Sequence, residues 1–150
     1  MKYETGEFGP IYPQFKGKAK EAIKWLRKQK QGECPNALYR EDIGYVDLVW
    51  GEPESLPKKG YGLAHIEAEH GNELKQLGFE IEDFIPITFT IGNVEHGRKG
   101  DKITIYSDTF KIIITTEWKG VHKKLLLTAF DMRSMRNKNK KRFEQKKSRH

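Results

Sequence analysis

An α+β fold, with N-terminal helices packed on a C-terminal antiparallel sheet, is predicted by the order of the hydrophobic patterns along the chain. Residues 18–31 carry apolar side chains at intervals of three and four, the spacing of an amphipathic helix. The last third instead contains runs rich in Ile, Val, Thr and aromatic residues, separated by short turns, which is typical of an antiparallel meander. Segregated helical and strand patterns favour α+β over alternating α/β.

The length and the charge distribution predict one domain followed by a basic tail. The 150 residues, of which 36% are hydrophobic, suit a single globular domain, which we expect to span residues 1–130. Residues 131–150 hold nine Lys or Arg and two acidic residues, so their net charge is +7, and the remaining 19 basic and 19 acidic residues balance. Such a tail either attracts phosphate backbones or is a flexible, solvated extension, and composition does not separate the two.

Several classes of protein are excluded by composition. The longest uncharged apolar stretch, residues 84–94, contains Pro86 and Gly92 and is shorter than the roughly 20 residues that span a bilayer. The first 30 residues lack the apolar run of a secretory signal, so we expect a cytoplasmic site of action and no membrane contact. Cys34 is the only cysteine, which excludes an internal disulfide and a Cys-rich metal site.

Local patterns predict the secondary structure of the first half of the chain. The Gly- and Pro-rich opening, residues 1–17, reads as an ordered loop, and Gly32 ends the first helix. A loop with Pro35 and Asn36 follows. The β-branched and aromatic run at residues 45–50 predicts a buried strand.

The second half contains one ambiguous segment. A helical stripe covers residues 63–77, although Gly71 is expected to bend or break it. Residues 82–91 alternate like a strand while Pro86 argues against a central strand, so a helix or an edge strand remains open. The meander strands are expected at residues 102–106, 110–118 and 123–130.

Histidine acid–base chemistry is the reaction type that the residues support best. The histidines, His65, His70, His96, His122 and His150, include no pair at the i, i+4 spacing of a helical metal site, and no phosphate-binding loop is present. We therefore expect neither a metal nor another cofactor. His65 follows the flexible basic segment 58–62 near a helix start, where free backbone amides help to hold a phosphate. A packed or exposed structural histidine is the alternative.

Candidate substrate-binding residues lie on the predicted strands and loops. Strict alternation along residues 123–130 places Lys124 and Thr128 on one partly open face, with Leu125, Leu127 and Ala129 on the core side. Arg98, in a Gly97–Gly100 turn, is either a phosphate clamp or a solvated residue.

Two further candidates have less certain roles. Asp47 lies within an apolar strand, where a carboxylate needs a partner, so it either orients a histidine or bonds the backbone. Tyr61, beside His65, is the aromatic residue best placed to stack on a base.

Three strings occur in an order that resembles a known family. They are Val46-Asp47-Leu48-Val49-Trp50-Gly51, then Tyr61-Gly62-Leu63-Ala64-His65-Ile66 with His70 close behind, then Trp118 and Leu125-Leu126-Leu127-Thr128-Ala129-Phe130. The order resembles the phage and polymorphic-toxin nucleases of the barnase, EndoU, colicin and RelE-like (BECR) superfamily. The resemblance covers residues 45–130.

The resemblance implies a metal-independent endoribonuclease that acts as a toxin or effector domain. RNA would be cut on the sheet face of the α+β fold, when the ribose 2′-hydroxyl attacks the adjacent phosphate and leaves a 2′,3′-cyclic phosphate. By matched motif, His65 is the general base or acid, Thr128 donates a hydrogen bond to a phosphate oxygen, and His70 is a second catalytic group or a packing residue. A cognate acidic inhibitor and delivery by a phage or toxin carrier are also implied. The oligomeric state is not indicated.

Two other functions compete with this one. A non-catalytic nucleic-acid-binding or phage structural module would use the basic tail instead of His65. A DNA nuclease is disfavoured because the chain shows no carboxylate cluster for metal ions.

Overall fold

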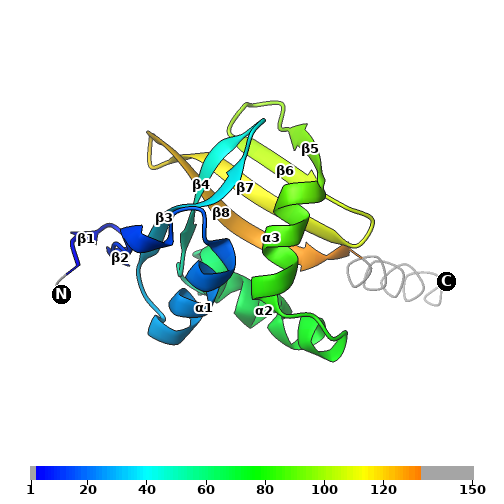
Figure 1. Ribbon diagram of the computed structural model, residues 1–150, viewed down its shortest axis with the longest axis horizontal. Coiled ribbons are helices and arrows are strands. Elements are labelled where there is room, and N and C mark those ends of the chain that lie inside the picture. Colours follow the sequence, from blue (N-terminus) through cyan, green and yellow to red (C-terminus); the bar gives the residue numbers. More distant parts are fainter. Residues whose placement is uncertain (1–2, 133–150) are drawn as a thin grey trace.

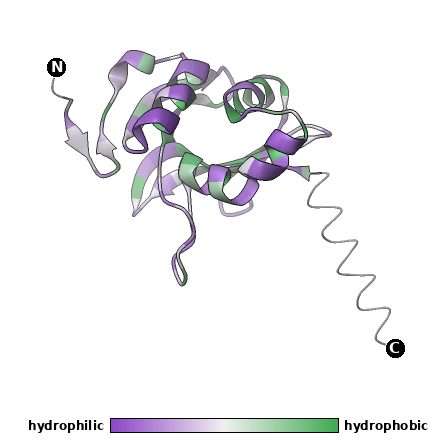
Figure 2. Cartoon of the chain, turned by 90° about the horizontal axis from the view of Figure 1, so that it is seen from below, coloured by the Kyte–Doolittle hydropathy of each residue, from purple (hydrophilic) through white to green (hydrophobic). Residues whose placement is uncertain are grey.

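The computed structural model describes residues 3–132 and shows an α+β fold with helices packed on one face of a mixed sheet (Figure 1). The sheet order is β3-β4-β8-β7-β6-β5. A small hairpin of β1 and β2 projects from one side of the body (Figures 1 and 2). The helical elements are η1 (Pro13–Phe15), α1 (Ala19–Gln29), α2 (Gly62–Gln76) and α3 (Ile81–Ile91). The strands are β1 (Thr5–Gly6), β2 (Gly9–Pro10), β3 (Glu33–Arg40), β4 (Gly44–Val49), β5 (Asn93–His96), β6 (Lys102–Tyr106), β7 (Phe110–Trp118) and β8 (Val121–Asp131).

The predicted meander is present, but it forms only part of the sheet. Strands β6, β7 and β8 pair antiparallel in sequence order, as the alternating patterns predicted. The correction is that β4 pairs in parallel with β8, with Asp47 opposite Leu125. This pair attaches the β3–β4 hairpin to the meander, so the sheet is mixed and extends beyond the C-terminal third of the chain.

Strand β3 was missed because its middle resembles a loop. The register between β3 and β4 shifts between Cys34 and Leu38, which accommodates Pro35 at the edge of the sheet. Asn36 has φ 57°, and its backbone N–H donates to Oδ1 of Asp47 at 2.7 Å. A side chain on β4 therefore replaces a missing ladder hydrogen bond, and the strand continues on both sides of the irregularity.

Helix α3 resolves the ambiguous segment. Its buried residues recur at helical spacing, while the Ile residues of the apparent strand alternation are divided between buried Ile85 and exposed Ile87 and Ile91. Pro86 lies inside the helix, where it removes one backbone donor. Burial of the helical stripe outweighs that loss. Helix α2 also runs unbroken through Gly71, contrary to the expected break.

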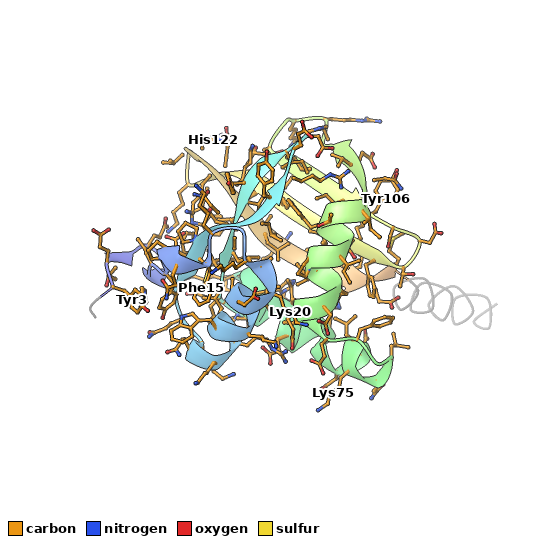
Figure 3. The ribbon with its side chains drawn as sticks, viewed as in Figure 1. Tyr3, Phe15, Lys20, Lys75, Tyr106 and His122 are labelled. Atoms are coloured by element: carbon orange, nitrogen blue, oxygen red, sulfur yellow. The ribbon has the colours of Figure 1, made fainter. Side chains whose placement is uncertain are left out.

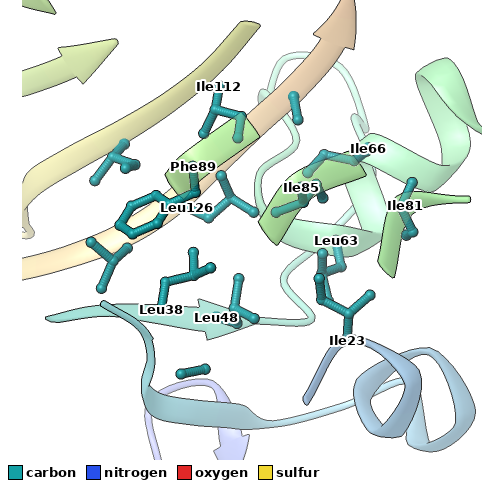
Figure 4. Packing of buried hydrophobic residues seen from close by; sticks show 14 of the residues in the cluster. Ile23, Leu38, Leu48, Leu63, Ile66, Ile81, Ile85, Phe89, Ile112 and Leu126 are labelled. Atoms are coloured by element: carbon teal, nitrogen blue, oxygen red, sulfur yellow. The ribbon is translucent and has the colours of Figure 1, made fainter. Parts of the chain in front are cut away.

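The hydrophobic core lies between the helices and the sheet (Figure 4). Helices α1 and α3 pack together across the sheet, and α2 packs against β4 and β8 (Figure 1). Each helix mixes hydrophobic and hydrophilic residues, as amphipathic helices do (Figure 2). The core residues shown include Ile23 from α1, Leu48 from β4, Ile66 from α2, Phe89 from α3 and Leu126 from β8.

Residues 133–150 lie outside the described part of the chain, and with them nearly all of the predicted basic tail. Strand β8 itself continues to Asp131, which is buried. None of the helices within residues 3–132 is long and apolar enough to cross a membrane.

Candidate active site

Helices cover one face of the sheet, and the opposite face carries polar and aromatic side chains. Residues paired across an antiparallel ladder point to the same side of a sheet. The buried core residues of β6, β7 and β8 point to the helices, so the residues between them point away. We call this side the open face; only Thr115 and Leu125 of its central residues are buried. Its cross-strand rows are Lys102, Thr115 and Leu125; Thr104, Ile113 and Thr128; and Tyr106, Lys111 and Phe130.

A β-bulge in β8 overturns the prediction that Lys124 and Thr128 lie on the same face of the sheet. Ile113 pairs with Thr128, whereas the next residue of β7, Ile114, pairs with Leu126, so Leu127 is an extra residue. One inserted residue reverses the alternation on one side of it. Lys124 therefore points to the opposite side from Thr128, and its Nζ donates to the backbone carbonyl of Ile43.

Lys123, rather than Lys124, belongs to the open face. Its Nζ lies 2.9 Å from Oε2 of Glu33 and 2.8 Å from Oδ2 of Asp47. Desolvation lowers the pKa of Lys123, but the hydrogen bonds to Asp47 and Glu33 and their charges raise it, and the net pKa is above its ordinary value. The carboxylate of Asp47 is thus shared between Lys123 and the backbone of Asn36. Of the two predicted roles, it bonds the backbone.

His65 lies near the start of α2, and its ring is close to Gly60 in the loop that precedes the helix. Its Nδ1 is buried and has no hydrogen-bond partner among residues 3–132. A Cβ on Gly60 would lie 2.8 Å from this nitrogen and 2.6 Å from the backbone nitrogen of Glu54. Only glycine allows the loop to approach so closely. The whole side chain remains partly exposed.

The His70 ring lies between the His65 ring and the ring of Phe130 on the open face. The two imidazole centroids are 6.2 Å apart with their planes at 90°, although five residues separate them along a continuous helix. The His70 ring in turn lies 5.7 Å from the ring of Phe130. Thr128 is two residues before Phe130 on the same face, about 7 Å along the strand. The structure therefore brings His65, His70 and Thr128 into one region.

Two polar residues of this region were not identified from the sequence. Lys111 is the cross-strand partner of Phe130, and Tyr106 is the partner of Lys111. Lys111 forms no ion pair within residues 3–132, so it is a cation available to a phosphate. Tyr106 lies near one end of β7, opposite Lys111, whereas His122 lies near the other end, opposite Glu117 (Figure 3). The only signal for Lys111 is its register with Phe130, which a single sequence does not show.

Tyr61 contacts aromatic neighbours instead of standing alone. Its ring centroid is 4.6 Å from that of Trp118 and 6.1 Å from that of Phe8. Burial raises the pKa of the Tyr61 hydroxyl, with smaller contributions from the charges of Glu52 and Glu7. The ring that was expected to stack on a base thus already contacts two aromatic side chains of the protein.

Arg98 does not lie near His65, His70 and Thr128. It is exposed in the turn between β5 and β6, at the far edge of the sheet from α2. Two strands separate this hairpin edge from β8, so the turn lies roughly 10 to 15 Å from the strand that carries Thr128. Residues 3–132 also contain no group of three or more His, Cys, Asp or Glu arranged to hold a metal ion.

Comparison with protein families gives one match. Residues 37–136 match the family described as phage-Barnase-EndoU-ColicinE5/D-RelE like nuclease 1, which is two thirds of the chain. The chain belongs to this nuclease family. The resemblance in the three sequence strings is thereby confirmed, and so is the BECR-like fold class. Neither the curated proteins nor the solved structures gave a match.

Family membership makes this BECR protein a nuclease by class. The match begins in β3 and includes α2, α3 and the rest of the sheet, so it contains His65, His70 and Thr128. The hairpin of β1 and β2 and helix α1 lie before it.

Proposed function

We propose that this BECR nuclease is a metal-independent endoribonuclease that leaves a 2′,3′-cyclic phosphate. The observation that carries the proposal is the approach of the His65 and His70 rings to 6.2 Å beside the open face. Cleavage by the 2′-hydroxyl requires one group to remove its proton and another to protonate the leaving 5′-oxygen. Two imidazoles at this separation suit both roles, and neither role requires a metal ion.

Each residue has a distinct part in the proposed reaction. The Nδ1 atom of His65 is buried against Gly60, so Nε2 is the nitrogen available to the substrate. We assign to His65 and His70 the two proton transfers: the base takes the 2′-hydroxyl proton as the oxygen bonds phosphorus, and the acid gives a proton to the 5′-oxygen as its bond to phosphorus breaks. Thr128 donates a hydrogen bond to a phosphate oxygen, and Lys111 offsets the charge that develops there.

The test is cleavage of total RNA by the purified protein in excess EDTA, with analysis of the product ends. We expect 2′,3′-cyclic ends from the wild type and a loss of rate of about 10²- to 10⁴-fold in His65→Ala and in His70→Ala. His122→Ala is the matched control, because His122 is an exposed histidine near the β7–β8 turn, six residues before Thr128 along β8. It should cleave like the wild type.

Two results would contradict the proposal. One is cleavage of an oligonucleotide that lacks every 2′-hydroxyl, because that group is the nucleophile. The other is full activity in His65→Ala. Degradation of supercoiled plasmid in magnesium, with RNA left intact, would instead show that the protein is a DNA nuclease.

The proposal extends to a toxin or effector role in the cytoplasm, with delivery by a phage or toxin carrier. An inhibitor with an acidic surface would suit the cations of the open face, because complementary charge speeds association. Expression of the intact chain without an inhibitor should arrest growth, whereas expression of His65→Ala should not. Normal growth at confirmed expression of folded wild type would contradict this role.

A further inference from the structure

Strands β3 and β4 present two exposed tyrosines that the proposed active site does not use. Tyr39 and Tyr45 are cross-strand partners, and their ring centroids are 4.7 Å apart with the planes at 49°. Tyr39 is 53% exposed and Tyr45 is 40% exposed. The Nζ atom of Lys16 lies 5.0 Å from the centre of the Tyr45 ring. Large aromatic rings with an adjoining cation are what single-stranded nucleic acids stack on.

The tyrosine pair lies on the same face of the sheet as Thr128. Asp47 pairs with Leu125 on the open face, and Tyr45 precedes Asp47 by two residues, so Tyr45 points to that side. Tyr39 follows as the partner of Tyr45. The strand rise and the strand spacing put Tyr45 roughly 15 Å from Thr128.

This separation corresponds to several nucleotides of one strand. Stacked nucleotides advance about 3.4 Å each along a strand, so a dinucleotide held at Thr128 does not reach Tyr45. The negative charge of Asp47, which lies between, is offset by Lys123. Because Lys123 also pairs with Glu33, these three side chains together keep one net negative charge, held in ion pairs at that position.

We propose that Tyr39 and Tyr45, with Lys16, form a stacking subsite for a base of single-stranded RNA that lies several nucleotides from the bond cut at the active site. The subsite rests on the proposed ribonuclease function for the identity of the strand. The exposed ring of Tyr39 carries the base, Tyr45 supports it from the neighbouring strand, and Lys16 contacts a phosphate. The subsite makes the protein favour long single strands over short ones.

The test is binding of a fluorescent 2′-O-methyl oligoribonucleotide, which lacks the attacking hydroxyl and stays intact on the wild-type protein. Fluorescence anisotropy gives the affinity for a probe long enough to span the face. We expect Tyr39→Ala and Tyr45→Ala to bind it about tenfold more weakly, and Tyr39→Phe and Tyr45→Phe to bind it like the wild type, because the ring provides the stacking. Lys16→Gln should reduce the salt dependence, with a slope smaller by about 0.7.

Ile87→Ala is the control, because Ile87 is 58% exposed on α3, on the helical side of the molecule. It should bind like the wild type. A second measurement needs no substitution: a photoreactive thiouridine probe on the wild type should crosslink to the β3–β4 peptides. Equal affinities for the wild type and for folded Ala variants, equal losses in the Phe and Ala variants, or crosslinks confined to other peptides would each overturn the subsite.

The outcomes also separate this subsite from the proposed function. Ring-dependent binding of the probe by a protein that cleaves no RNA supports the subsite and contradicts the ribonuclease. Cleavage of RNA with ring-independent binding supports the ribonuclease and overturns the subsite.

Discussion

Lys123 forms ion pairs with two carboxylates that the fold withdraws from water, and its removal should destabilise the protein. Its ammonium contacts Glu33, which is 6% exposed, and Asp47, which also holds the backbone of β3. Lys123→Met keeps most of the aliphatic stem and deletes the charge. Breaking a buried pair by removing one partner costs about 3–5 kcal/mol. Because Lys123 keeps some contact with water, we expect the lower end, a loss of about 3 kcal/mol in the free energy of unfolding.

Urea unfolding at neutral pH measures this loss. The matched control is Lys119→Met, on the same hairpin, because Lys119 pairs with Glu7 in an exposed contact at 2.6 Å. Solvent and salt screen that pair, so its removal should change the midpoint far less. A loss in Lys123→Met no greater than in Lys119→Met would refute the argument that burial makes the first pair important.

The pH dependence gives a second check with a defined sign. The pKa of Lys123 is raised by folding, so its contribution to stability is complete below the ordinary lysine pKa of about 10.4 and is lost as the pH rises through the folded pKa. The difference between wild type and Lys123→Met should therefore stay constant around neutral pH and shrink in strong alkali. A difference that grows with alkaline pH would have the wrong sign.

Three other predictions concern the loop over His65, helix α2 and the single thiol. Gly60→Ala should lower RNA cleavage at least about tenfold, because its Cβ would press on the loop backbone and on His65 Nδ1, while Ser55→Ala on the same exposed loop should cleave normally. Gly71→Ala should raise the free energy of unfolding in urea by about 0.5–1 kcal/mol, because its Cβ meets Glu67 at an ordinary 3.5 Å; a decrease would contradict the fit. Burial raises the pKa of the Cys34 thiol to about 12, so a disulfide reagent should label it only in urea, and rapid labelling of the native protein would contradict its burial.

Elements whose stability is local were predictable from the sequence. Helix α1 and strands β4, β6, β7 and β8 show their periodicity within their own residues. Strand β3 depends on a partner instead, because Asn36 takes a left-handed conformation and receives its hydrogen bond from Asp47 on the next strand. Helix α3 tolerates Pro86 because its buried stripe packs into the core, and burial against distant segments is not visible in a short window.

In the candidate site too, residues within a local motif were predictable, and residues placed by strand register were not. His65, His70 and Thr128 were predicted from a motif, and the ring contacts from His65 to His70 and from His70 to Phe130 place them in one region. Lys111 stands in no motif, and its nearness to Phe130 follows from strand register alone. Base stacking by Tyr61 stays a prediction, and its contacts with Trp118 and Phe8 were not predictable because those residues come from segments far away in the chain.

The bulge at Leu127 shows most clearly why the faces of the β8 side chains could not be predicted from the sequence. The extra residue reverses the phase of the alternation between Lys124 and Thr128, and the register with β7 shifts again between Thr115 and Glu117. The sheet therefore directs Lys123 to the carboxylates on the open face and Lys124 to the carbonyl of Ile43. Whether a strand bulges depends on how it pairs with its neighbour, here β7, and not on its own pattern. Of two adjacent lysines with the same local propensity, pairing with another strand decides which one shares a face with Thr128.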